Sequence, residues 1–102
     1  MPPTRTKLNP DAAADAEEAA SWYAERSALA AKGFLAELDL VLGRVLEAPG
    51  RWPQFEMGTR RYVMPRYPFS LIYRIRDREI EVIAVAHHRR RPDYWKRRRR
   101  AQ

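Results

Sequence analysis

The sequence contains no cysteine, which excludes disulfide bonds and thiolate metal sites. It has no apolar run of 18 residues, so we expect no transmembrane helix. The N-terminus leads into no apolar segment of the signal-peptide kind, and the simplest expectation is a cytoplasmic protein. The four glycines are scattered, which argues against a glycine-rich phosphate-binding loop.

Charge is distributed unequally between the two halves of the chain. Residues 1–50 carry five Lys/Arg and eight Asp/Glu, a net charge of −3, whereas residues 51–102 carry fifteen and five, a net charge of +10. The difference favours a polyanionic or acidic partner for the C-terminal half. A basic tail that only improves solubility is the simpler alternative.

Two helices are predicted in the first half of the chain. Asn9 is suited to cap the first helix and Pro10 to begin it, and alanines at helical spacing then form an apolar stripe. Ser27 is expected to interrupt this helix and cap a second one, whose apolar face ends before Pro49. So short a link joins antiparallel helices, and their apolar face needs a sheet to cover it.

Three segments rich in β-branched and aromatic residues follow, at residues 60–64, 70–75 and 80–86. Separated by turn-forming residues, they predict an antiparallel meander. The third segment is apolar at almost every position, as expected of an inner strand that is covered on both faces.

The predicted fold is therefore α+β, with a helical hairpin packed on a small antiparallel β-sheet in the order β-α-α-β-β-β. Residues 4–8 supply a short edge strand at the start. We expect one domain over residues 1–102. Residues 96–102 form a basic tail, as either a frayed segment or a short terminal helix.

The third predicted strand leads into the basic run His87-His88-Arg89-Arg90-Arg91. Adjacent histidines on a strand point to opposite faces, and no carboxylate lies near them in sequence, so we expect neither a metal site nor a cofactor. The arginines beside His88 could hold a phosphate in bidentate fashion, although a histidine without a functional role is equally compatible with the pattern. Tyr94 could stack on a nucleic-acid base or pack against the sheet, as we expect for Trp95.

Three segments resemble one known superfamily when they are taken in this order and spacing. They are Ala20-Ser21-Trp22-Tyr23, residues 65–74 (PRYPFSLIYR), and residues 82–87 (VIAVAH) with the basic run and Pro-x-Tyr-Trp that follow. Together they resemble the RelE/ParE toxins of bacterial type II toxin–antitoxin systems over nearly the whole chain. The resemblance implies a small α+β fold, an initial strand that closes the sheet, and an antitoxin that wraps around the toxin.

The superfamily has two main activities. RelE-like members cut messenger RNA on the ribosome, whereas ParE-like members poison DNA gyrase and are not nucleases. The resemblance places His88 and Tyr94 at or near catalytic positions of the nucleases. However, Ser70 stands where those nucleases carry an arginine, and no lysine lies between Lys32 and Lys96. Cleavage needs a base for the 2′-hydroxyl and cations for the developing charge, so the ParE-like branch is favoured.

We therefore predict a growth-inhibiting toxin that poisons DNA gyrase, without enzymatic activity of its own, and that is neutralised by an acidic antitoxin which folds on binding. One alternative is a ribosome-dependent endoribonuclease, with His88 and Tyr94 as acid–base residues. Another is a non-toxic nucleic-acid-binding module with steep salt dependence. The candidates for contact with the target or its phosphates are Arg61, Arg89, Arg90 and Arg91.

Overall fold

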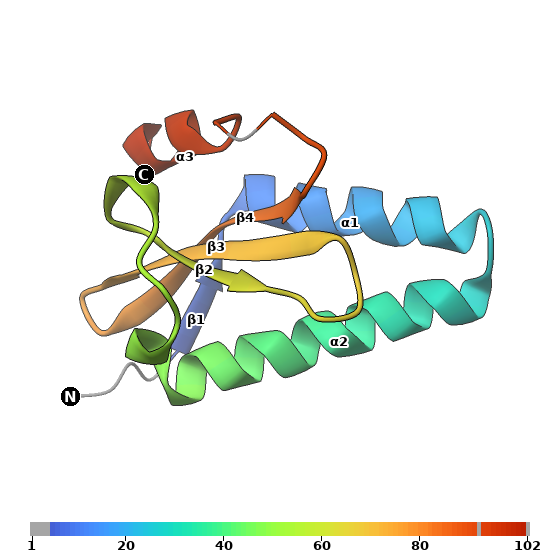
Figure 1. Cartoon of the computed structure of the whole chain (residues 1–102), viewed down its shortest axis with the longest axis horizontal. Coiled ribbons are helices and arrows are strands. Elements are labelled where there is room, and N and C mark those ends of the chain that lie inside the picture. Colours follow the sequence, from blue (N-terminus) through green and yellow to red (C-terminus); the bar gives the residue numbers. More distant parts are fainter. Residues whose placement is uncertain (1–4, 92, 102) are drawn as a thin grey trace.

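The computed structural model describes residues 5–91 and 93–101. The helices and strands are β1 (Arg5–Leu8), α1 (Pro10–Ala24), α2 (Ala28–Glu47), β2 (Arg60–Val63), β3 (Phe69–Arg76), β4 (Glu79–His87) and α3 (Lys96–Ala101) (Figure 1). The α+β order predicted from the sequence is confirmed, and part of the predicted basic tail forms the short helix α3. Thr4 and Gln102, the outer ends of the predicted first strand and tail, lie outside the described residues.

The four strands form one sheet in the order β1-β4-β3-β2. Strands β2, β3 and β4 make the predicted antiparallel meander. Strand β1 pairs with β4 in parallel, with Thr6 opposite Ile80, so the sheet is mixed and the expectation of an antiparallel sheet was wrong for this strand. A long crossover, and not a hairpin turn, joins β1 to β4, and a crossover permits parallel pairing.

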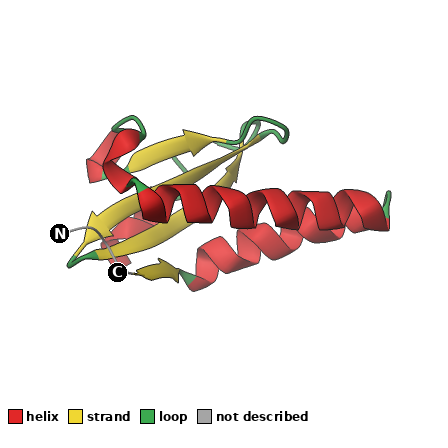
Figure 2. Cartoon of the chain, turned by 90° about the horizontal axis from the view of Figure 1, so that it is seen from below, coloured by secondary structure: helices red, strands yellow, loops and turns green. Residues whose placement is uncertain are grey.

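Helices α1 and α2 lie side by side as a hairpin along the sheet, and the tip of the hairpin extends beyond the strands (Figure 2). Ser27 caps α2 as predicted, because its Oγ accepts a hydrogen bond from the Ala30 N–H at 3.2 Å. Asn9 precedes α1 without a capping bond from its side chain, and its backbone N–H instead donates to the Val82 carbonyl at 3.1 Å. No helix in the described part of the chain is long and apolar enough to cross a membrane.

The core between hairpin and sheet joins small residues of α1 to larger ones of α2 and the strands. Its buried members include Ala12, Ala16, Ala19, Phe34, Leu38, Val41, Leu71, Tyr73 and Val82. Alanine brings the α1 backbone close to the sheet, so the larger side chains of α2 fill the remaining volume. This arrangement explains why the alanine stripe predicted from the sequence is buried.

A bulge in the β3–β4 ladder sends two consecutive residues to the opposite face of the sheet. Ile72 lies opposite Ala84 and Tyr73 opposite Val82, so Ile83 is the extra residue. Ile83 and Ala84 consequently both join a second buried cluster, with Ile72 and Trp95. The segment after β4 covers this second face, which explains why β4 is apolar along most of its length.

Gly43→Ala is expected to raise the free energy of unfolding by about 0.5–1 kcal/mol, because alanine favours the helix and restricts the unfolded chain. Gly43 lies on the exposed face of α2, and nothing lies within 4 Å of the place where a Cβ would be. Gly33→Ala is the matched control: a Cβ there would lie 2.7 Å from the Tyr67 hydroxyl oxygen, so its gain should be smaller. Urea denaturation measures both, and a loss of stability in Gly43→Ala would contradict the expectation.

Candidate functional site

A hollow of about 360 Å³ opens where β2, β3 and the segment after β4 meet. Five of the six predicted site residues line it, namely Arg61, His88, Arg90, Arg91 and Tyr94. The sixth, Arg89, is exposed and lies outside the hollow. We call this feature the basic hollow, since no carboxylate is among its lining residues. The described residues hold no group of three or more His, Asp or Glu side chains suited to a metal ion.

The floor of the basic hollow contains a hydrogen-bonded pair, Ser70 and His88. The Ser70 Oγ lies 2.9 Å from His88 Nε2, and Ser70 is buried while His88 is exposed. The backbone N–H of His88 also donates to the Pro68 carbonyl at 2.9 Å. These two bonds hold the imidazole at the end of β4 and leave its exposed side available to a ligand.

His87 lies between the basic hollow and the ring of Phe69, whose centroid is 4.9 Å from that of the imidazole. Burial lowers the pKa of His87, and the neighbouring His88 and Arg89 lower it further. The Nδ1 atom accepts a hydrogen bond from the Arg89 N–H at 3.0 Å. A neutral His87 therefore fixes the turn that carries the arginines.

The buried carboxylate of Asp15, on α1, engages two of the predicted site residues. The Tyr94 hydroxyl donates to Asp15 Oδ2 at 3.2 Å, and an Arg90 nitrogen lies 3.6 Å from Oδ1. Arg98 of α3 contacts both carboxylate oxygens, at 2.7 and 3.1 Å. The Val85 N–H donates to the same carboxylate at 3.1 Å. Asp15 therefore connects α1, β4, the basic segment and α3.

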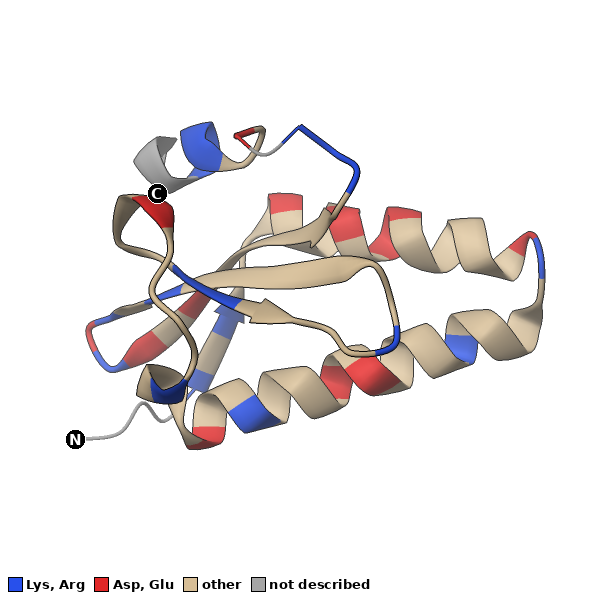
Figure 3. Cartoon of the chain, in the orientation of Figure 1, with Lys and Arg blue, Asp and Glu red and all other residues tan. Residues whose placement is uncertain are grey.

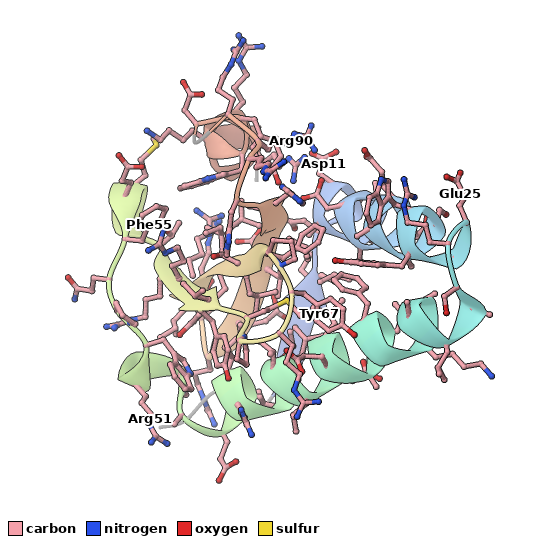
Figure 4. The ribbon with its side chains drawn as sticks, turned by 45° about the vertical axis from the view of Figure 1, so that its right-hand side comes forward. Asp11, Glu25, Arg51, Phe55, Tyr67 and Arg90 are labelled. Carbon is pink, nitrogen blue, oxygen red and sulfur yellow. The ribbon has the colours of Figure 1, made fainter. Side chains whose placement is uncertain are left out.

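The guanidinium group of Arg90 lies between the Tyr94 ring and Asp15 of α1. It stacks on the Tyr94 ring at 3.8 Å from the centroid, and Figure 4 shows it beside the N-terminal half of α1, where Asp11 is labelled. Arg90 thus shares the Asp15 carboxylate with Arg98. Arg90 also lines the basic hollow, and unlike Arg61 and Arg91 it has an acidic partner among the described residues.

Asp15 is not among the site residues predicted from the sequence. A signal was present, because Asp15 falls at helical spacing within the buried stripe of Ala12, Ala16 and Ala19. An acidic residue on an apolar face is rarely buried without a partner. The partner itself could not be identified, since Arg98 lies 83 positions away in sequence.

Tyr94→Phe is expected to reduce the fall in the free energy of unfolding that occurs as the pH rises above about 10. Burial raises the pKa of Tyr94 well above its usual value of 10.0, and the Asp15 charge raises it further. The unfolded chain therefore loses the phenolic proton first, and stability that is complete below pH 10 falls above it by up to about 1.4 kcal/mol per pH unit.

Tyr73 makes a similar contribution that the Tyr94→Phe variant retains, because burial raises the pKa of Tyr73 to about 12. Urea denaturation between pH 9 and about 11.5 compares the two proteins in the range where the unfolded tyrosine ionises. Parallel curves for the wild type and Tyr94→Phe would contradict the expectation.

Comparisons with known proteins relate this geometry to a family. The sequence profile described as "ParE toxin of type II toxin-antitoxin system, parDE" matches residues 6–92. No protein with a curated function matches the sequence. A solved structure titled "Chromosomal ParDE TA system from P. aeruginosa" superposes with a TM-score of 0.68 at 19% identity, and the match covers 82% of this chain and 95% of that chain. At this identity, the structural likeness shows the fold alone.

Proposed function

Because this chain belongs to the ParE family of toxins from type II toxin–antitoxin systems, we propose that it poisons DNA gyrase and that a cognate antitoxin neutralises it. The observation that carries this proposal over a nuclease is the environment of Tyr94. Its hydroxyl donates its proton to the Asp15 carboxylate at 3.2 Å, and burial next to that charge raises the pKa of Tyr94, which disfavours the phenolate that a general base requires. The basic hollow therefore lacks a tyrosine that could accept a proton from a 2′-hydroxyl.

A ribosome-dependent endoribonuclease is the second candidate, and one observation favours it. Arg61, Arg91 and His88 line a single hollow, as a site that stabilises a phosphate in its transition state requires. Against it, His88 Nε2 is within hydrogen-bonding distance of Ser70, and Arg90 pairs with Asp15, a carboxylate that it shares with Arg98. Such a site suits the binding of an anion better than in-line cleavage.

The proposed antitoxin is an acidic segment that folds on binding. The chain carries a net charge of +7, which attracts such a segment and accelerates the encounter. A flexible acidic partner can also cover a large surface of a small domain.

The deciding experiment combines the purified protein with gyrase, ATP and relaxed plasmid. Inhibited supercoiling, together with linear DNA released after the enzyme is denatured, is the expected result. Topoisomerase I relaxing the supercoiled form of the same plasmid is the control, because a basic protein that merely covers DNA would inhibit both enzymes. Full gyrase activity combined with messenger RNA cleavage on ribosomes would refute the proposal and establish the second candidate.

A further inference from the structure

Two cations of the basic hollow have no acidic partner among the residues that the structure describes. Arg61 and Arg91 form no ion pair with any residue of the described ranges 5–91 and 93–101. Elsewhere, carboxylates balance several basic side chains, in the pairs Arg5–Glu79, Arg66–Glu37, Arg74–Glu81, Lys96–Glu56 and Arg98–Asp15. A fixed positive charge that is left uncompensated beside a hollow attracts an anion.

A second polar hollow on the same molecule differs from the basic hollow because acidic residues line it as well as basic ones. It lies beside β1, measures about 300 Å³, and mixes the basic Arg5, Lys7 and Arg76 with Asp77, Glu79 and Glu81. Opposite charges there satisfy one another, so an incoming anion gains little. The basic hollow, which has no acidic lining residue, is the better anion site of the two.

The hydrogen-bond donors of the basic hollow come from three different parts of the chain. Arg61 projects from β2, with its guanidinium 4.7 Å from the centroid of the Phe55 ring. Ser70 and His88 form the floor, and Arg91 lines the hollow from the segment after β4. A phosphate group offers acceptor oxygens in several directions, whereas a carboxylate offers two in one plane, so these spread donors suit a phosphate.

Exposed basic residues extend the positive surface beyond the basic hollow. In Figure 3, the Lys and Arg positions of the segment after β4 and of α3 lie in the upper part of the view, and those at the start of β2 lie below them. Arg89 and Arg97 are exposed members of this surface. A positive surface of this kind can bind successive phosphates along the backbone of a nucleic acid.

We propose that the basic hollow binds a backbone phosphate of DNA, through the guanidinium groups of Arg61 and Arg91 and the polar floor formed by Ser70 and His88. The inference rests on the proposed function in one respect: if the protein poisons gyrase, the DNA in the hollow is the segment that gyrase holds. Contacts to phosphate carry no sequence information. The binding is therefore independent of DNA sequence and falls steeply with salt.

The test uses the full chain and a fluorescent duplex of mixed sequence, titrated by anisotropy at several salt concentrations. Arg61→Ala and Arg91→Ala should each weaken binding by about tenfold, as the loss of a charge-assisted hydrogen bond predicts. Each should also reduce the slope of log affinity against log salt by about 0.9. Arg61→Lys, which keeps the charge but loses the planar fork, should lie between the wild type and Arg61→Ala.

The matched control is Lys32→Ala, which removes the same charge from an exposed position on α2 and should change the affinity less than about twofold. An equal loss in Lys32→Ala would overturn the inference, because net charge alone would then explain the binding. Equally tight and equally Arg61-dependent binding of poly-glutamate would also overturn it, in favour of an acidic protein. Circular dichroism confirms that each variant is folded.

Gyrase assays run in parallel separate this inference from the proposed function. Gyrase poisoning by a wild-type protein whose DNA binding does not depend on Arg61 and Arg91 would refute the phosphate site and leave the proposed function intact. Binding of DNA that depends on both arginines, without any effect on gyrase, would uphold the site and refute the proposed function. Loss of DNA binding together with loss of poisoning in both arginine variants is the result we expect.

Discussion

Asp15→Ala should lower the free energy of unfolding by about 3–5 kcal/mol, because removing one partner of a buried ion pair leaves the other charge uncompensated. Asp15 is 6% exposed, and its carboxylate contacts the Arg98 guanidinium through two hydrogen bonds. The same substitution also leaves the Val85 N–H and the Tyr94 hydroxyl without their acceptor. An unsatisfied buried donor adds its own penalty.

Urea denaturation of Asp15→Ala and Asp11→Ala provides the comparison. Asp11 belongs to the same helix and approaches the same arginine, with Oδ2 3.8 Å from Arg98 Nε, but its side chain is 61% exposed. An exposed pair of this kind contributes about 0–1 kcal/mol, so Asp11→Ala should have little effect. Similar losses in the two variants would show that burial of the Asp15 network does not determine its contribution.

The same network has a consequence for the basic hollow. Arg90 and Tyr94 lose their anchor in Asp15→Ala, and both line the hollow. Because the substitution removes a negative charge and leaves Arg90 without its carboxylate beside the hollow, we expect the folded protein to bind DNA more tightly than the wild type. An anisotropy titration under conditions in which the variant is fully folded tests this consequence.

Trp95→Ala should also lower the free energy of unfolding by about 3–5 kcal/mol, the usual cost of truncating a buried tryptophan. Trp95 is 2% exposed and belongs to the cluster that contains Ile72 and Ile83. Its ring centroid lies 6.0 Å from that of Phe55. The substitution opens a cavity between the sheet and the segment that covers its second face.

Trp22→Ala is the matched control for Trp95→Ala, because the Trp22 side chain is large but 51% exposed. We expect a loss of less than about 1 kcal/mol from it. Urea denaturation followed by circular dichroism avoids relying on the fluorescence of the residue that is replaced. A small loss in Trp95→Ala would mean that the C-terminal segment does not seal the second face of the sheet.

Local sequence patterns were sufficient to predict most of the secondary structure. The period of the apolar residues predicted both long helices, and Ser27 marked the start of the second one. The apolar character of residues 80–86 predicted an inner strand, which β4 is. These features depend on neighbours within a few positions, and such neighbours are visible in the sequence.

The pairing of strands that lie far apart in the sequence was harder to predict from the sequence. The parallel direction of β1 follows from how the hairpin packs over the sheet, and no residue of β1 records it. No sequence feature indicates the bulge at Ile83 either, because the residues on both sides of that position are also apolar. Its effect is to place Ile83 and Ala84 on one face, where strict alternation would have separated them.

The sequence by itself determined the α+β fold, the location of the basic segment after β4, and five residues of the hollow that the segment helps to form. Only the tertiary structure decided which of those arginines pair with a carboxylate and which do not. Asp15 lies 75 positions or more from Arg90 and Arg98 and contacts both guanidinium groups, whereas Arg61 and Arg91 face a hollow that no carboxylate lines. The physical reason is that the interaction between charges depends on distance and burial in space, which folding sets and sequence separation does not.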